Sequence, residues 1–133
     1  MAKTYMTAQI NESPTITEKA GAEIKSDARG LFMKYDENGN VIPASTAGEK
    51  VIGVSIITNS DAIAKGQDVD IQVKEIGLAR AGAAIKKGDE VTAGADGKAA
   101  VAEGGNFVVG TALEEAEAGQ FFYMQITKFY KPA

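Results

Sequence analysis

The chain of 133 residues contains neither cysteine nor histidine, and these two absences exclude most familiar kinds of site chemistry. Without cysteine there is no disulfide bond, no thiolate metal ligand and no thiol nucleophile. Without histidine the commonest general base and the commonest transition-metal ligand are missing. A Ser–Lys pair or a carboxylate pair remains chemically possible, but neither a G-x-S-x-G elbow nor a Gly-rich phosphate loop occurs. We therefore predict that the protein is not an enzyme and holds no metal ion or cofactor.

Positive charge and long hydrophobic runs are also scarce. Only two arginines are present, Arg29 and Arg80, and the formal net charge is −4. Nucleic-acid binding normally requires a basic face, so we expect no nucleic-acid partner. The longest apolar runs are only a few residues, which predicts neither a membrane span nor a signal peptide. We expect a protein that is made and folded in a reducing cytosol.

Glycine, in contrast, is plentiful, with 15 residues, and 44% of the chain is hydrophobic. Glycine destabilises the interior of helices, whereas turns between short strands tolerate it well. The hydrophobic content is enough for one core at this chain length. The composition therefore indicates a single domain of short strands and turns.

A short apolar run with an internal glycine occurs twice, as VIGVSI from Val51 and as FVVGTAL from Phe107. Each run follows a hairpin-type turn, Asn38-Gly39 or Asp96-Gly97, and precedes a polar stretch that ends in Gly-Gln. An alternating strand comes next in each copy, with inward residues Val69, Ile71 and Val73 or Phe122, Met124 and Ile126. We interpret the chain as two diverged β units, about residues 21–76 and 82–127. Because each unit alone is too small to bury its faces, we expect one shared core.

These patterns predict a mainly β fold: a small single-domain β-barrel or β-roll built from two similar halves. The interior strands should be Val51–Ile57 and Phe107–Leu113, and Ile76–Arg80 should continue the first sheet past a bend. The segment 113–118 should be an irregular link or at most one helical turn, because Gly119 follows it. Asp36–Asn40 has some features of a calcium loop, but the carboxylate that such a loop needs further on is absent, so we interpret it as a turn.

Residues 1–20 show no helical or strand periodicity and should form an extended N-terminal arm, with the β domain spanning 21–133. Tyr5, Met6 and Ile10 are isolated apolar residues on this polar stretch. The arm is either a disordered tail or a segment that becomes ordered on a partner, and the residues favour neither.

Five of the nine aromatic residues lie between Phe121 and Tyr130. Phe122 should face the core, which places Phe121 and Tyr123 on the opposite face of the strand. Exposed aromatics on a sheet often mark a contact surface, although a loop or the arm could also cover them. The candidate contact residues are Tyr5, Met6, Ile10, Phe121, Tyr123, Phe129 and Tyr130.

The succession GLFMKYDENGNVIPASTAGEKVIGVSI, GQDVDIQVKEIGLARAG, AAIKKGDEVTAGADGKA and VVGTALEEAEAGQFFYMQI resembles the head-decoration, or capsid cement, proteins of tailed bacteriophages. The resemblance covers about residues 21–127 and depends on glycine spacing and strand patterns. It implies a β-rich, non-enzymatic protein on the exterior of the expanded capsid, synthesised in the bacterial host cytoplasm. The implied partners are the major capsid protein and the protein itself, as a homotrimer whose N-terminal arm joins a capsid sheet edge. The chain lacks the Pro/Ala-rich N-terminal stretch of the lambda-type members.

Two other interpretations remain. A tail-tube or baseplate β protein would assemble into rings or tubes rather than stay small. A small carrier or ligand-binding barrel would fit the duplicated halves, and Lys98 follows a hairpin turn as a carrier lysine would. However, Lys98 lacks the flanking residues of a biotinyl or lipoyl site.

Overall fold

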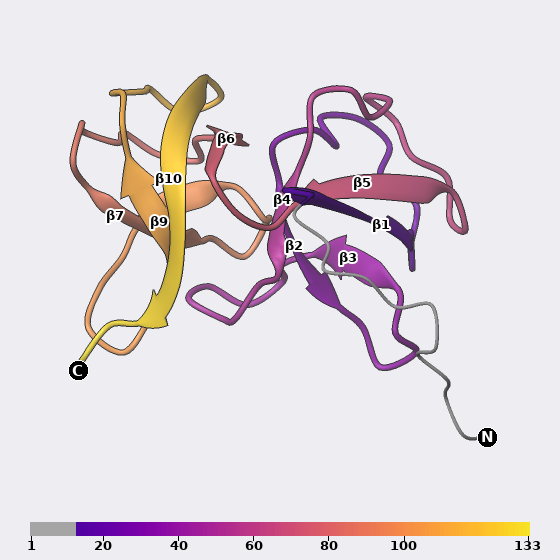
Figure 1. The fold of residues 1–133 in the computed structure, drawn as a ribbon, viewed down its shortest axis with the longest axis horizontal. Helices are drawn as coiled ribbons and strands as arrows, with labels where there is room; N and C mark the ends of the chain where they lie inside the picture. Colours follow the sequence, from indigo (N-terminus) through magenta and orange to yellow (C-terminus); the bar gives the residue numbers. More distant parts are fainter. Residues whose placement is uncertain (1–12) are drawn as a thin grey trace.

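The structure, a computed structural model, describes residues 13–133, and this part of the chain contains ten strands and no helix. The strands form two antiparallel sheets of five strands each. The first half contains β1 (Thr15–Lys19), β2 (Phe32–Tyr35), β3 (Val41–Pro43), β4 (Gly53–Ser55) and β5 (Asp68–Gln72). The second half contains β6 (Ile76–Arg80), β7 (Glu90–Ala93), β8 (Ala99–Val101), β9 (Phe107–Ala112) and β10 (Phe121–Tyr130). Figure 1 shows the two halves side by side.

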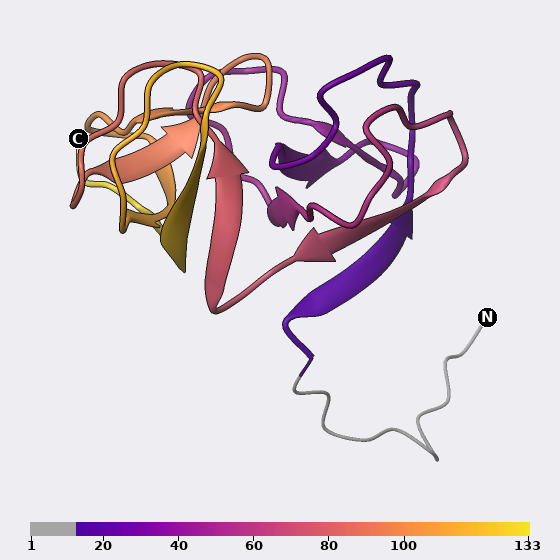
Figure 2. The same cartoon turned by 90° about the horizontal axis from the view of Figure 1, so that it is seen from above.

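The two sheets have the same topology, which confirms the prediction of two similar halves. The strand orders are β1-β5-β4-β2-β3 and β6-β10-β9-β7-β8, so each strand of the first half has its equivalent five strands later. The prediction that Ile76–Arg80 continues the first sheet is wrong, because this segment is β6 and lies at the edge of the second sheet. The chain bends between β5 and β6 (Figure 2), and Glu75 in this link has a φ of 71°. A residue in this left-handed conformation interrupts an extended strand.

The predicted N-terminal arm is described only from Ser13 onward, and Tyr5, Met6 and Ile10 lie outside the described residues. Residues Thr15–Lys19 form β1, which pairs antiparallel with β5. The carbonyl of Pro14 also accepts a hydrogen bond from the N–H of Val73, at 2.8 Å. The last part of the segment 1–20 therefore belongs to the first sheet.

Each sheet curls until its outer strands meet. Ala20, directly after β1, forms a parallel bridge to Val41 in β3, and Ala81, directly after β6, forms the equivalent bridge to Ala99 in β8. In both halves the N–H of the following glycine donates a 2.8 Å hydrogen bond to the carbonyl of the bridge partner. Closure satisfies main-chain groups that would otherwise lie at an open edge.

Because each sheet closes on itself, the expectation of one shared core is wrong for the first half. That half encloses its own cluster: Ala20, Ala28, Leu31, Met33, Val41, Ile63, Val69 and Ile71. A second cluster fills the other half and extends across the junction to four residues of the first half, Phe32, Ala44, Val51 and Val54. Side chains alternate along a strand, so Met33 of β2 points into the first cluster while Phe32 points into the second.

The predicted interior strands are interior, because β4 lies between β5 and β2 and β9 lies between β10 and β7. The first of these strands, Gly53–Ser55, is shorter than predicted, and Ile57 and Leu113, at the predicted ends, are exposed. Of the predicted inward residues, Val73 is half-buried. The others are buried: Val69, Ile71, Phe122, Met124 and Ile126.

The two glycines of the repeated apolar run occupy equivalent positions of close main-chain approach. A Cβ added to Gly53 would lie 2.1 Å from the carbonyl oxygen of Gln72 in β5. A Cβ added to Gly110 would lie 2.1 Å from the carbonyl oxygen of Gln125 in β10. Neither glycine has a positive φ, so the glycine is required by the space between strands and not by its own backbone conformation.

The loop between β3 and β4 joins the two halves through main-chain hydrogen bonds. The N–H of Gly48 donates to the carbonyl of Ala93 at 2.8 Å, and the carbonyl of Gly48 accepts from the N–H of Phe107 at 3.0 Å. The N–H of Phe32 also donates to the carbonyl of Gly97, at 2.8 Å. The junction therefore combines paired backbone groups with the shared apolar cluster.

The carboxylate of Glu49 organises this junction loop. It accepts hydrogen bonds from the main-chain N–H groups of Ser45 and Thr46, both at 2.7 Å, and from the ammonium of Lys34 at 2.8 Å. Burial alone would raise the pKa of Glu49, but these donors stabilise the ionised form and hold the pKa below its usual value of 4.5. Glu49 thus stabilises the junction in its charged state.

Replacing Gly110 by alanine should destabilise the protein by about 3 kcal/mol, because β9 and β10 must separate to admit the Cβ. Gly66→Ala is the matched control. Nothing lies within 4 Å of the Cβ at that position, and only the positive φ opposes the substitution, at about 1 kcal/mol. Urea unfolding of both variants measures the difference. Equal losses would show that the close approach to Gln125 is not the constraint.

The free energy of unfolding should also fall at acid pH, because Glu49 becomes protonated there. Its folded-state pKa is below the unfolded value, so its contribution is present above pH 4.5 and is lost as pH falls through the folded pKa. Glu49→Gln should lower the free energy of unfolding at neutral pH and flatten its decline below pH 4.5. Denaturant unfolding as a function of pH checks this, with the exposed Glu37→Gln as control. Parallel pH curves for wild type and Glu49→Gln would contradict it.

Candidate functional site

The described residues contain no group of three or more His, Cys, Asp or Glu side chains that could hold a metal ion. Between residues 13 and 133 no helix is long and apolar enough to cross a membrane. Candidate sites are therefore surface depressions and exposed apolar faces.

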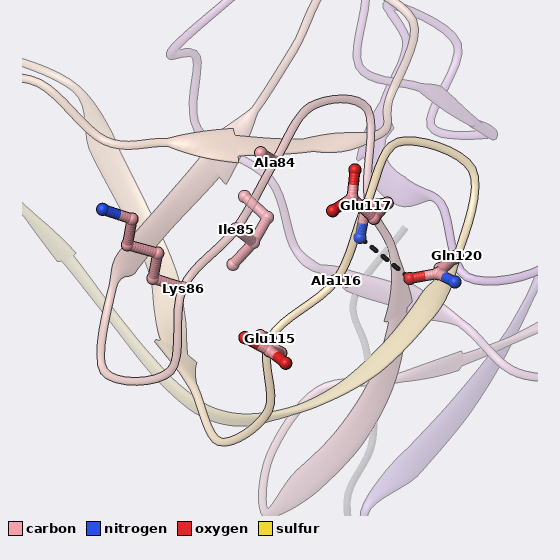
Figure 3. A pocket seen from close by; sticks show the side chains of 7 residues that line it. All are labelled: Ala84, Ile85, Lys86, Glu115, Ala116, Glu117 and Gln120. Carbon is pink, nitrogen blue, oxygen red and sulfur yellow. Dashed lines mark hydrogen bonds between the residues drawn. The ribbon is translucent and has the colours of Figure 1, made fainter.

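The first depression, of about 380 Å³, lies between the loop before β7 and the loop before β10 (Figure 3). Ile85 and Ala116, which form an antiparallel bridge, line it together with Lys86 and Glu115. The side-chain oxygen of Gln120 accepts a 2.9 Å hydrogen bond from the N–H of Glu117. The amide is thereby used to close the turn, and the depression holds no nucleophile beside a base.

An equivalent depression of about 310 Å³ occurs in the first half. Ile24 and Ile63 form the matching bridge, and the side-chain oxygen of Gln67 accepts a 3.0 Å hydrogen bond from the N–H of Ala64. The loops that line both depressions lie along the upper edge of the molecule in Figure 1. The depressions are thus a structural consequence of the repeat.

The predicted aromatic residues of β10 fall into two groups. Phe121 and Tyr123 lie opposite Arg80 and Leu78 of β6. The guanidinium of Arg80 lies 4.3 Å from the centre of the Phe121 ring, a cation–π contact. A Cβ on Gly30 would meet the same ring at 2.7 Å, so Phe121 packs against the first half. Phe121 therefore supports the junction, whereas the Tyr123 side chain is 52% exposed.

Phe129 and Tyr130 lie beyond an irregularity in β10. The register between β9 and β10 shifts between Ile126 and Phe129, and Lys128 in this interval has a φ of 29°. The ring of Tyr130 makes an edge-to-face contact with buried Phe107, with 5.1 Å between ring centres. Phe129 and Tyr130 are both exposed. Because of the register shift, the alternation of inward and outward side chains that holds around Tyr123 does not continue to them.

Lys128 ties the irregularity to the first half. Its ammonium donates a 2.6 Å hydrogen bond to the carbonyl of Ile52. Burial, and secondarily repulsion from Lys50, lowers the pKa of Lys128 below its usual value. This lysine is a structural link and not a free cation.

Several exposed apolar residues were not among the sequence-based candidates: Tyr35, Ile57, Ile76, Val101 and Leu113. Tyr35 donates a hydrogen bond to the carboxylate of Glu18, and this bond, with a smaller effect of burial, raises the pKa of Tyr35. Ile76 lies beside Gln125, and the N–H of Leu113 donates to the carbonyl of Tyr123 at 2.8 Å. Ile76 and Leu78 lie two residues apart in the sequence, so their side chains share one face of a strand. This spacing could have predicted an apolar outward face.

Comparisons with known proteins give the family. A family model described as phage cement protein matches residues 8–126. Among solved structures, the chain is similar to the head fiber gp8.5 N base of bacteriophage phi29, with 25% sequence identity and a TM-score of 0.65. That similarity covers 85% of this chain and 92% of the phi29 chain. No curated protein matches the chain.

The family match includes both repeats and most of the chain, and the all-β fold with two similar halves agrees with it. The chain belongs to the phage cement protein family and is a structural decoration protein of the phage head.

Proposed function

We propose that this protein binds the major capsid protein on the outer surface of the expanded head and connects neighbouring capsomers as a homotrimer. The family match over residues 8–126 carries the proposal. The phi29 protein of similar structure is, by its description, the base of a head fiber, which supports a position on the outside of the shell.

The proposed mechanism is reinforcement by repetition. Each contact between one copy and the shell contributes a modest free energy, but a shell carries many copies. Packaged DNA presses outward on the shell, so many of the contacts between this protein and the shell must break before the shell opens. Expansion of the shell changes the spacing between capsomers, and only the expanded spacing would match the bound protein.

The proposal includes no catalytic step. The sequence provides no histidine or cysteine, and the two equivalent depressions beside the Ile24 and Ile85 bridges are lined mainly by apolar and charged side chains that form no nucleophile–base pair. The net charge of −4 fits an exterior position better than contact with packaged DNA.

Purified protein should bind expanded capsids and not procapsids. The measurement is co-sedimentation with each shell, followed by quantification of the bound chain, with light scattering to give the mass of the free protein. Equal binding to both shells, or no binding to expanded shells, would contradict the proposed function. A free mass other than three chains would contradict only the trimer.

We propose that Tyr5, Met6 and Ile10 contribute to capsid binding. Deleting residues 2–12 should leave the melting temperature nearly unchanged, because β1 and the hydrogen bond from the N–H of Val73 to the carbonyl of Pro14 are retained. The same deletion should abolish co-sedimentation with expanded capsids. A large drop in melting temperature would show instead that this segment is part of the fold.

A further inference from the structure

The repeat provides an internal comparison for the outer faces of two strand pairs, β1–β5 and β6–β10. The pairs have the same place in their sheets and the same register. In both halves the alanine after the first strand donates its N–H to the glutamine before the second, at 2.8 Å, which fixes the alignment. The equivalent cross-strand pairs are Thr15–Gln72 with Ile76–Gln125, Thr17–Asp70 with Leu78–Tyr123, and Lys19–Asp68 with Arg80–Phe121.

The face of the first half is polar, and two of its three cross-strand pairs are joined through their side chains. The hydroxyl of Thr17 donates a 2.6 Å hydrogen bond to the carboxylate of Asp70. The ammonium of Lys19 lies 2.6 Å from the carboxylate of Asp68. This fold therefore forms the strand pair with polar side chains on its outer face.

At the positions equivalent to Thr15, Thr17 and Asp70 the second half carries the apolar side chains of Ile76, Leu78 and Tyr123. Ile76 and Tyr123 are each 52% exposed. Leu78, the cross-strand partner of Tyr123, is half-buried. Leu113 is exposed, and its N–H donates to the carbonyl of Tyr123. We define these four residues as the β6–β10 face. Since the first half forms the same strand pair with Thr15, Thr17 and Asp70, the fold does not require apolar residues at Ile76, Leu78 and Tyr123. An exposed apolar cluster that the fold does not need is typical of a contact surface.

The charges around the β6–β10 face disfavour a two-fold contact with a second copy. Glu75 precedes Ile76, and Glu114 follows Leu113 and accepts the N–H of Tyr123 at 2.9 Å. Two copies joined symmetrically through this face would bring these carboxylates close to one another.

The cation at the far end of the strand pair does not offset these acids. Arg80 is held within its own chain, where its guanidinium donates to the carbonyls of Arg29 and Gly119. The fitting occupant is therefore an apolar surface bordered by basic or amide donors.

We infer that the β6–β10 face is the surface through which this protein docks on the major capsid protein, at an apolar patch with a basic or amide rim. This inference rests on the proposed function and assigns it to four residues. It also gives the two halves different roles, because the equivalent face of the first half is polar.

The test transfers the polar pair of the first half to the second. Leu78→Thr with Tyr123→Asp reproduces the Thr17–Asp70 pair in the same register, so the variant should fold. Its apparent affinity for expanded capsids should fall at least about tenfold, because apolar area buried at the contact is lost. The matched control, Thr17→Val with Asp70→Asn, alters the first-half face and should bind like wild type. Wild-type binding by the face variant would overturn the inference.

The readouts separate this inference from the proposed function. If wild-type protein fails to bind expanded capsids, the proposed function fails; if wild type and the face variant bind equally, only the inference fails. Should the double variant not fold by circular dichroism, Ile76→Thr, which copies Thr15, replaces it with the same expectation. A photo-crosslinking residue at position 123 should join the chain to the capsid protein. Crosslinks to a second copy of this chain, or a free mass that changes in the variant, would assign the face to self-association and overturn the inference.

Discussion

The structure depends on two places where neighbouring strands approach so closely that no Cβ fits between them. At Gly53 and Gly110 the carbonyl oxygen of a glutamine in the next strand occupies the space that a side chain would need. The approach allows β4 to pack on β5, and β9 on β10, tightly enough for each sheet to curl and meet its own edge. Closure then creates an interior for each half and leaves the outer faces of β2 and β4 available for the junction.

The two halves are alike in topology but not in how they contact each other. The turn at Gly97 packs against Pro43 and Phe32 of the first half, whereas a Cβ at the equivalent Gly39 would meet nothing within 4 Å. Gly48 donates to and accepts from the second half. The contact is thus heterologous within one chain, as between non-equivalent surfaces in an assembly. Because the two halves use different surfaces to contact each other, equivalent surfaces need not carry the same residues. The faces of β1–β5 and β6–β10 could therefore diverge.

Much of the fold could be predicted from residues with a strict local requirement. The glycines of the apolar runs, the Asn38-Gly39 and Asp96-Gly97 turns and the alternation of Val69 and Ile71 each reflect a steric or burial constraint that any such fold must meet. The start of the second unit could not be found in this way. β1 and β6 read TITEK and IGLAR, and edge strands of this kind impose backbone pairing but little side-chain identity. The separate first cluster was also missed, because closure of a sheet is a property of pairs such as Ala20 and Val41 that are distant in sequence. The residues of the β6–β10 face could be predicted only in part: Tyr123 stood out as an aromatic, whereas Ile76 and Leu113 are recognised as its exposed neighbours only in the fold.

The division of the core into two clusters gives synthesis and folding a direction. The first cluster consists entirely of residues 20–71, so the first half has all of its interior side chains once β5 has left the ribosome. The second cluster includes Phe32, Ala44, Val51 and Val54, so its interior is complete only against a first half that already exists. Domains generally fold from the N-terminus during translation. The earlier half can therefore act as a template on which the later half assembles, which reduces the time that β9 and β10, with the core side chains Phe107, Phe122 and Met124, spend exposed to other nascent chains.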